Sequence, residues 1–147
     1  MNHKILIPAI LVLPIALSAA RPSPDPVRAR ADGTLRGLVR QAERRDRTLS
    51  SVGLFAGAYN ILRANVGLEK LDVLFDVAAE LQDRNPESRT YGNFRWYARD
   101  GFVMDHNAVD FCMQEGSLIA RDYRDRLTPD QRAKFDHLCE LAIEGSI

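Results

Sequence analysis

The sequence predicts an all-α protein of about five helices in antiparallel hairpins, with one long aromatic-rich loop. Three observations lead to this fold class. Apolar residues recur at helical spacing from about residue 33 onward. The sequence Thr-Pro-Asp-Gln at 128–131 has the residues of a capping box, with proline at the first helical position. Strand-rich segments and internal repeats are not evident.

The composition fits one small soluble domain. The 147 residues include 20 Lys or Arg and 20 Asp or Glu, so the formal net charge is zero. Hydrophobic residues make up 46% of the chain and charged residues 27%, near the averages for soluble globular proteins. Recognition of nucleic acid needs a basic excess or a basic face, so this balance argues against nucleic acid as the main partner.

Residues 1–20 have the three parts of a signal peptide. Lys4 gives a positive start, residues 5–17 form an uncharged apolar run, and Ser18-Ala19-Ala20 offers small residues for cleavage after Ala20. We therefore expect an exported protein, periplasmic or secreted, with no stable membrane span after cleavage. The alternative is an uncleaved anchor, but the run is shorter than the roughly 20 residues that span a bilayer.

The segment 21–32 follows the predicted signal peptide and is rich in proline. Pro22, Pro24 and Pro26 alternate with other residues, which predicts a flexible, non-helical leader. The helical domain is then expected to cover residues 33–147.

Three apolar stripes at helical spacing follow one another in the first half of this domain. They cover residues 35–42, 49–66 and 68–81. Gly53 and Gly57 lie four residues apart in the second stripe, which would permit close packing of another helix at some cost in helix propensity.

Two further helices are predicted near the C-terminus. Residues 109–127 form an amphipathic stripe, for which Asp105 or Asn107 is the expected N-cap. The capping box starts the next helix, which is expected to run over 128–144 and to stop at Gly145. The very short connection predicts that these two helices pack as an antiparallel hairpin.

The hairpin carries the two cysteines, Cys112 and Cys139, which should face the same core. In an oxidising compartment the two thiols can form a disulfide. The alternative is a pair of small buried apolar residues, and the helical register sets the two about one turn out of step. Both readings stay open at this point.

Residues 86–104 fit neither a helical nor an alternating period, so we expect a long loop, or a loop with a short extended piece. Long irregular connections are usually functional or disordered, and the aromatic content here argues against disorder. Aromatic rings beside polar side chains are typical of carbohydrate sites, where a ring stacks on the sugar and polar groups bind its hydroxyls. The candidate carbohydrate-binding residues are Tyr91, Asn93, Phe94, Arg95, Trp96, Tyr97, Asp100 and Asp105.

Two other interpretations of this loop remain. The aromatic side chains could simply hold the loop against the helices. Alternatively, Asp100 and Asp105 could be the paired carboxylates of a glycosidase, which lie about 5 to 9.5 Å apart. The common catalytic motifs are absent from the sequence, and His106 and His137 have no second histidine at helical spacing. We therefore predict no catalytic residues, no metal site and no cofactor.

Two segments, Thr90-Tyr91-Gly92-Asn93-Phe94-Arg95-Trp96-Tyr97 and the stretch from Asp105 to Met113, resemble the N-terminal part of large exported bacterial proteins similar to (α/α) toroids. Such toroids occur in polysaccharide lyases and glycoside hydrolases. The resemblance covers roughly residues 35–145 and implies an array of helical hairpins with carbohydrate as the substrate class. A whole toroid needs several hundred residues, so the resemblance implies that this chain is a fragment or a truncated frame.

The sequence Leu127-Thr128-Pro129-Asp130-Gln131 is similar to the L-T-x-x-Q motif of small helical periplasmic stress chaperones and metal-resistance sensors. Their size, export signal and helical content also agree with this chain. That family usually carries the motif twice, whereas it occurs once here. A protein of that class should expose a concave apolar helix face and form a dimer.

Overall fold

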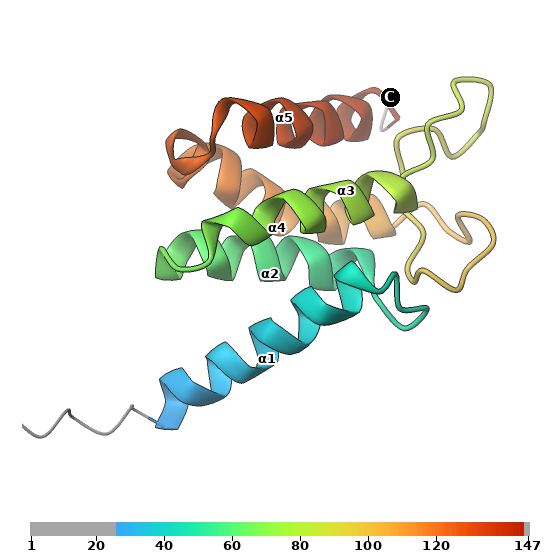
Figure 1. Ribbon diagram of the computed structural model, residues 1–147. Coiled ribbons are helices and arrows are strands. Elements are labelled where there is room, and N and C mark those ends of the chain that lie inside the picture. The colour runs from blue at the N-terminus through green and yellow to red at the C-terminus, as the bar shows by residue number, and fades with distance from the viewer. Residues whose placement is uncertain (1–25, 146–147) are drawn as a thin grey trace, which may run out of the picture.

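The computed structural model describes residues 26–145 and is all-α (Figure 1). The described part contains five α-helices, which are α1 Pro26–Glu43, α2 Ser51–Ala64, α3 Leu71–Leu81, α4 Ala108–Asp122 and α5 Pro129–Glu144. Two short 3₁₀ turns, η1 Leu68–Lys70 and η2 Arg124–Arg126, lead into α3 and α5. None of these helices is long and apolar enough to cross a membrane. The predicted signal peptide lies outside the described residues.

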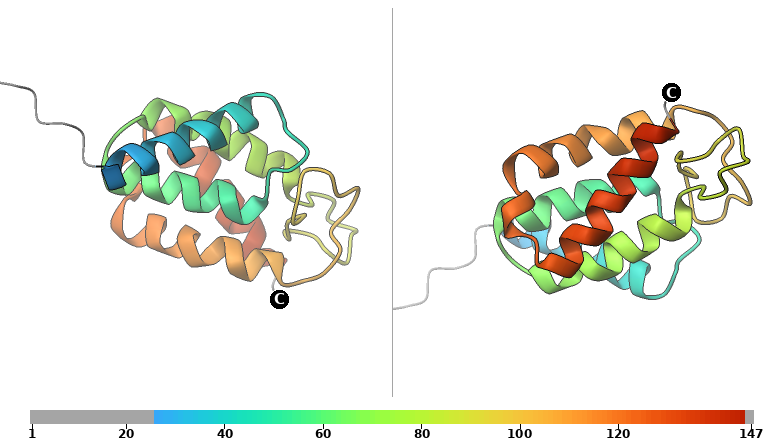
Figure 2. Two further views of the ribbon diagram at one scale, coloured as in Figure 1. Left: turned by 90° about the horizontal axis from the view of Figure 1, so that it is seen from below. Right: turned by 90° about the horizontal axis from the view of Figure 1, so that it is seen from above.

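Successive helices reverse direction and alternate between two layers. Helices α1, α3 and α5 pack in one layer, and α2 and α4 pack in the other (Figures 1 and 2). Helix α1 packs against α2 and α3, α2 also packs against α3 and α4, and α5 packs against α3 and α4. The predicted C-terminal hairpin is present as α4 and α5. However, α5 packs more extensively against α3 than against α4, a choice of partner that the short connection does not determine.

The first helix begins earlier than the sequence predicts. The leader was expected to be non-helical up to residue 32, but α1 starts at Pro26, so that expectation is wrong from Pro26 onward. Proline is well tolerated in the first turn of a helix, because the amide hydrogen that it lacks has no partner there. Only residues 21–25 of the predicted leader lie outside the described part.

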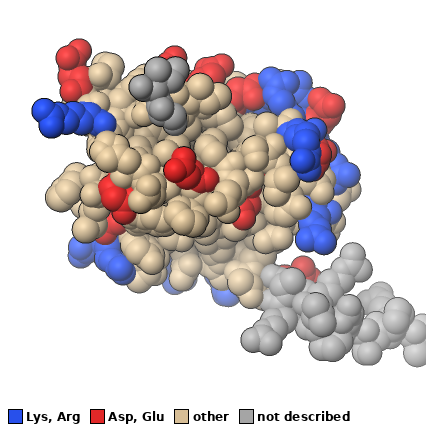
Figure 3. All heavy atoms as spheres, turned by 180° about the vertical axis from the view of Figure 1, so that it is seen from behind, with Lys and Arg blue, Asp and Glu red and all other residues tan. Residues whose placement is uncertain are grey.

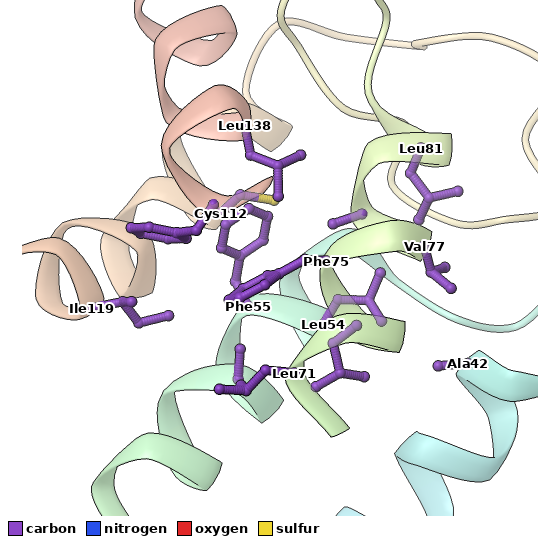
Figure 4. Packing of buried hydrophobic residues seen from close by; sticks show 14 of the residues in the cluster. Ala42, Leu54, Phe55, Leu71, Phe75, Val77, Leu81, Cys112, Ile119 and Leu138 are labelled. Carbon is purple, nitrogen blue, oxygen red and sulfur yellow. The ribbon is translucent and has the colours of Figure 1, made fainter. Parts of the chain in front are cut away.

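The core lies between the two layers and is filled by the predicted apolar stripes (Figure 4). Phe75 of α3 and Phe135 of α5 are almost fully buried, with ring centroids 5.6 Å apart. At Gly57 of α2, an added Cβ would lie 2.2 Å from Cδ2 of Leu38. The predicted close packing at this glycine therefore occurs, with α1 as the partner.

The start of α5 is the capping box that the sequence predicts. The Thr128 hydroxyl accepts a bond from the Gln131 amide, and the Gln131 side chain accepts one from the Thr128 amide. Gln131 is buried and also donates to the Leu68 carbonyl and the Asp72 carboxylate, at 3.0 and 2.9 Å. The motif therefore starts one helix and fixes it to another. Gly145 ends α5 as predicted.

The two cysteines are free thiols in the structure, so of the two alternatives that the sequence leaves open, the structure has the unbridged pair. Cys112 is fully buried in the core, whereas Cys139 lies at its edge and is partly buried. The helical register sets the two cysteines about one turn out of step, which agrees with their different burial. Burial is the main cause that raises the pKa of each thiol to about 12.

Candidate functional site

The connection from α3 to α4, residues 82–107, forms a loop at one end of the two layers (Figure 1). Its middle is bonded to the neighbouring connection between α1 and α2. The amides of Ala98 and Arg99 donate to the carbonyls of Leu49 and Arg47, at 2.8 and 3.0 Å. Two isolated β-bridges, Ser50 with Tyr97 and Gln82 with Phe94, flank this extended piece. The loop with a short extended piece is therefore present as predicted.

Two of the predicted carbohydrate-binding residues are buried in the protein. Phe94 is fully buried, with its ring centroid 5.5 Å from that of Phe55. Asn93 is 4% exposed, and its Oδ1 accepts bonds from the amides of Phe94 and Val109. Val109 lies in the first turn of α4, so Asn93 caps that helix from a distant position. The side chain of Asn107, the residue just before α4, makes no capping bond.

Trp96 and Asp105 are joined at the base of the loop. The indole Nε1 donates to Oδ2 of Asp105 at 2.7 Å, and the indole ring lies 5.4 Å from the ring of Phe111. Oδ1 of Asp105 accepts from the Asn107 amide at 2.8 Å. The bond from that amide and the bond from Trp96 lower the pKa of Asp105. This carboxyl therefore stays ionised and organises the loop.

The remaining predicted residues connect parts of the loop to one another. Arg95 donates to the carbonyls of Glu80 and Asp100, at 2.6 and 2.8 Å. Oδ2 of Asp100 accepts from the Tyr97 amide at 2.8 Å. The Tyr97 ring is 38% exposed and lies 4.3 Å from the Arg99 guanidinium.

Tyr91 contacts the end of α5 instead of the other predicted residues. Its hydroxyl donates to Glu144 at 3.1 Å. The eight residues are thus spread over the core, the base of the loop and its two sides, and they do not form a single cleft.

A cavity of about 310 Å³ lies beside the loop. Of the predicted residues only Arg95 lines it, together with Glu80, Leu81, Gln82, Asp83, Ser88, Thr90, Gly101, Phe102 and Val103. Sequence reasoning missed most of this wall, because its residues are separated along the loop and follow no motif. The apolar run Phe102-Val103-Met104 inside a polar loop was the one available signal.

The cavity wall carries a compact hydroxyl and carboxylate cluster. The hydroxyls of Ser88 and Thr90 both donate to Oδ2 of Asp83, at 2.5 and 2.6 Å, and the Asn85 amide donates to Oδ1. Partial burial raises the pKa of Asp83, but these hydrogen bonds outweigh it and the net pKa is lowered. Asp83 is therefore an ionised acceptor that fixes the two hydroxyls.

Gln82 forms the buried side of the same cavity. Its side chain is 6% exposed, and its Nε2 donates to the carbonyls of Gly92 and Leu138. Its Oε1 is buried and has no hydrogen-bond partner among the described residues. Buried polar atoms nearly always have a partner, and this oxygen is an exception that is closed off from the cavity.

Several large apolar side chains are exposed in and beside the loop. Phe102 is 72% exposed, Met104 66% and Phe111 45%. Phe102 lies at the cavity, whereas Met104 does not line it. An exposed ring beside fixed polar groups gives this end of the molecule the features of a small ligand site.

A second cavity, of about 430 Å³, lies along α1. Leu35 and Val39 of α1 and Ile61 of α2 form its apolar part, and charged side chains including Arg36 and Glu43 stand at its edge. It holds no cluster of oriented polar groups comparable to that around Asp83.

The face of the molecule that lies behind the view of Figure 1 carries no comparable cluster of polar groups among the residues that the structure describes. Figure 3 shows few charged side chains in the middle of that face, and basic and acidic groups mixed toward its edges. Several of the basic side chains in α4, η2 and α5 are ion-paired, for example Arg121 with Asp122 and Arg124 with Asp136. This pattern is typical of a solvated surface. Within residues 26–145 there is also no group of three or more His, Cys, Asp or Glu side chains that could hold a metal ion.

Comparison with known proteins adds no relative, since no family model, curated protein or solved structure matches this chain.

Proposed function

We propose that this is an exported helical protein that binds carbohydrate at the loop 82–107 without catalysing its cleavage. The observation that carries the proposal is the 310 Å³ cavity, in which fixed hydroxyl groups and a guanidinium lie beside the exposed ring of Phe102. Sugars present an apolar ring face together with many hydroxyls, and such a wall offers partners for both. Small-ligand pockets in general combine apolar area with a few oriented polar groups.

The absence of catalysis follows from the state of the loop carboxylates. A glycosidase needs a carboxylic acid whose pKa is raised, opposite a second carboxylate. Hydrogen bonds instead lower the pKa of Asp105 and Asp83. Asp100 accepts a bond from the backbone of its own turn. These carboxylates therefore act as fixed acceptors in the proposed site.

The helix arrangement supports the proposed relationship to the (α/α) toroids. Helices α1 and α2, α2 and α3, and α4 and α5 pack as consecutive pairs, and each of α1, α2 and α3 also packs against the helix two further along, as helices do in arrays built by stacking helical pairs. The loop then lies at the end of the layers where α3 ends and α4 begins, and such connections commonly carry binding sites.

Binding should be measured with a panel of soluble polysaccharides and oligosaccharides, by affinity electrophoresis and calorimetry. One stacked ring and a few hydrogen bonds predict dissociation constants from the millimolar to the high micromolar range, a binding free energy of about 4–5.5 kcal/mol. Saturable binding of at least one glycan with no reducing ends released would support the proposal. Failure of every glycan to bind at millimolar concentration would overturn it.

Export is a separate part of the proposal and needs its own test. N-terminal sequencing of the protein from its native host should find Arg21 as the first residue, because Ser18-Ala19-Ala20 offers the cleavage site. An intact Met1 on a cytosolic product would contradict export and leave the binding proposal standing.

The cavity along α1 favours a second candidate function, that of a small periplasmic chaperone. Its apolar lining would suit an unfolded client chain. The L-T-x-x-Q motif supports this candidate less, because Thr128 and Gln131 are used to cap α5 and to contact α3. The test is suppression of aggregation of a reduced, unfolded model protein. Leu35→Glu should abolish any suppression, because Leu35 lines the cavity and is only partly buried, whereas Phe102→Ala should not change it.

A further inference from the structure

We propose that the 310 Å³ cavity is a subsite for a single uncharged sugar ring, which stacks on Phe102 and is held by Ser88, Thr90 and Arg95. The inference rests on the proposed carbohydrate function. It adds to that function where the ligand binds, how large the ligand is and what charge it carries. None of these three properties could be read from the sequence, because seven of the eight predicted residues do not line the cavity.

The polar wall is matched to a ligand that both donates and accepts hydrogen bonds. Ser88 and Thr90 both give their hydroxyl protons to Asp83, so what they offer a ligand is acceptor oxygens. Arg95 uses one hydrogen bond from each terminal nitrogen for the carbonyls of Glu80 and Asp100, and a guanidinium has five N–H donors in all. A sugar hydroxyl can donate to the first pair and accept from Arg95.

The Gln82 side chain closes the inner side of the wall, and its Oε1 is too deeply buried to meet a ligand. Its Nε2 is fixed by two carbonyls, which sets the orientation of the amide, and Oε1 has no partner in the described part of the chain. Gln82 is therefore a fixed structural part of the wall and not a contact for the ligand.

The charges at the wall select against an anionic ligand. Asp83 is an ionised carboxylate of the wall, and Glu80 is a second acidic residue of the lining, beside one basic residue, Arg95. The second guanidinium nearby, that of Arg45, is paired with Glu80 at 2.8 Å and is not part of the lining. Like charges repel in a partly desolvated site, so a uronate should bind more weakly than the corresponding neutral sugar.

The size of the cavity limits the ligand to about one ring. Pockets for small ligands run from about 300 to 1,000 Å³, and this cavity stands at the lower limit. The apolar partner is Phe102, which is 72% exposed and has a face available for stacking. A longer glycan would therefore place one residue here, and its other residues would lie outside the cavity.

The test is a titration of the ¹⁵N-labelled protein with glucose, galactose, mannose and glucuronate, followed by amide chemical shifts. A neutral sugar should shift the amides of Ser88, Thr90 and Phe102 most, and glucuronate should bind at least several-fold more weakly than glucose. Phe102→Ala should weaken binding about tenfold, the value of one stacked ring. Gly101→Leu should block binding, because Gly101 lines the cavity. The variant should fold, because a Cβ at Gly101 meets no atom within 4 Å.

Met104→Ala is the matched control, because Met104 is 66% exposed in the same loop and does not line the cavity. Its affinity should equal that of the wild type. Glycan binding that Phe102→Ala and Gly101→Leu leave intact would overturn this inference and spare the proposed function. If glucuronate bound more strongly than glucose, the inference that the cavity prefers an uncharged sugar would be wrong. If the wild-type protein bound no glycan at all, both proposals would be wrong.

Discussion

Gly92 of the loop and Gly145 at the end of α5 meet backbone to backbone. A Cβ on Gly92 would lie 1.9 Å from the Leu141 carbonyl oxygen, and a Cβ on Gly145 would lie 1.7 Å from the Tyr91 carbonyl oxygen. Gln82 reaches the same helix through its bond to the Leu138 carbonyl. The loop that holds the candidate site is therefore attached directly to the last turns of α5.

Gly92→Ala should destabilise the protein by at least about 2 kcal/mol. Gly92 has φ 77°, a conformation that side chains disfavour, and the added methyl group would also collide with α5. The free energy of unfolding from urea titration measures the effect.

Gly101→Ala is the control in the same loop, since a Cβ there meets nothing within 4 Å, and its effect should stay within about 0.5 kcal/mol. Gly145→Ala should be intermediate, because its φ of −74° suits alanine and only the collision with the Tyr91 carbonyl remains. Equal stability of Gly92→Ala and the wild type would contradict the close approach.

Asn93→Ala should cost about 2–3 kcal/mol, because it leaves the buried amides of Phe94 and Val109 without their acceptor. Native-state hydrogen exchange should show faster exchange at Val109, the first turn of α4. Asn93→Asp keeps an acceptor near the N-terminus of α4, where negative charge is favourable, but it loses the bond to the Asp105 carbonyl. Its cost should therefore be smaller than that of Asn93→Ala, and a larger cost would contradict the capping role.

The helices could be predicted from sequence because their determinants are local. The Thr128 to Gln131 box and the stop at Gly145 depend on neighbours within one turn of helix, and Gly57 shows its packing role by the absence of a side chain. The start of α1 was missed because proline forbids the interior of a helix but not its first turn.

The site could not be predicted in the same way, because its determinants are distant in sequence. Asn93 caps a helix that begins 15 positions later, with the Val109 amide as its partner. The sequence does not distinguish the two phenylalanines, yet Phe94 is buried in the core and Phe102 is exposed to solvent. Only the path of the loop separates a ring that fills the core from a ring that can meet a ligand.

Asp72→Asn should flatten the loss of stability in acid. The hydrogen bond from Gln131 is the largest cause that lowers the pKa of Asp72 below 3.8, and Lys134 adds to it. A carboxyl with a lowered folded pKa contributes stability that is fully present above its unfolded value and is lost as the pH falls through the folded value. The wild type should therefore lose stability below about pH 4 more steeply than the variant.

Thermal unfolding between pH 2 and 6 measures both slopes. The matched control is Glu87→Gln, which removes an exposed carboxylate whose side chain has no hydrogen bond or ion pair within the described residues. This variant should keep the wild-type slope. Parallel curves for Asp72→Asn and the wild type would show that the contact between α3 and α5 does not depend on this charge.

Both cysteines should resist alkylation in the native protein. Burial raises the pKa of Cys112 and Cys139 to about 12, and only the thiolate reacts. At pH 8 each thiol should therefore react at least about a hundredfold more slowly than the same residue in urea-unfolded protein. Cys139 should react before Cys112, because it is partly exposed whereas Cys112 is fully buried. Mass spectrometry after unfolding without reductant should find both residues alkylated, and a protein that takes up no label until it is reduced would contradict the free-thiol state.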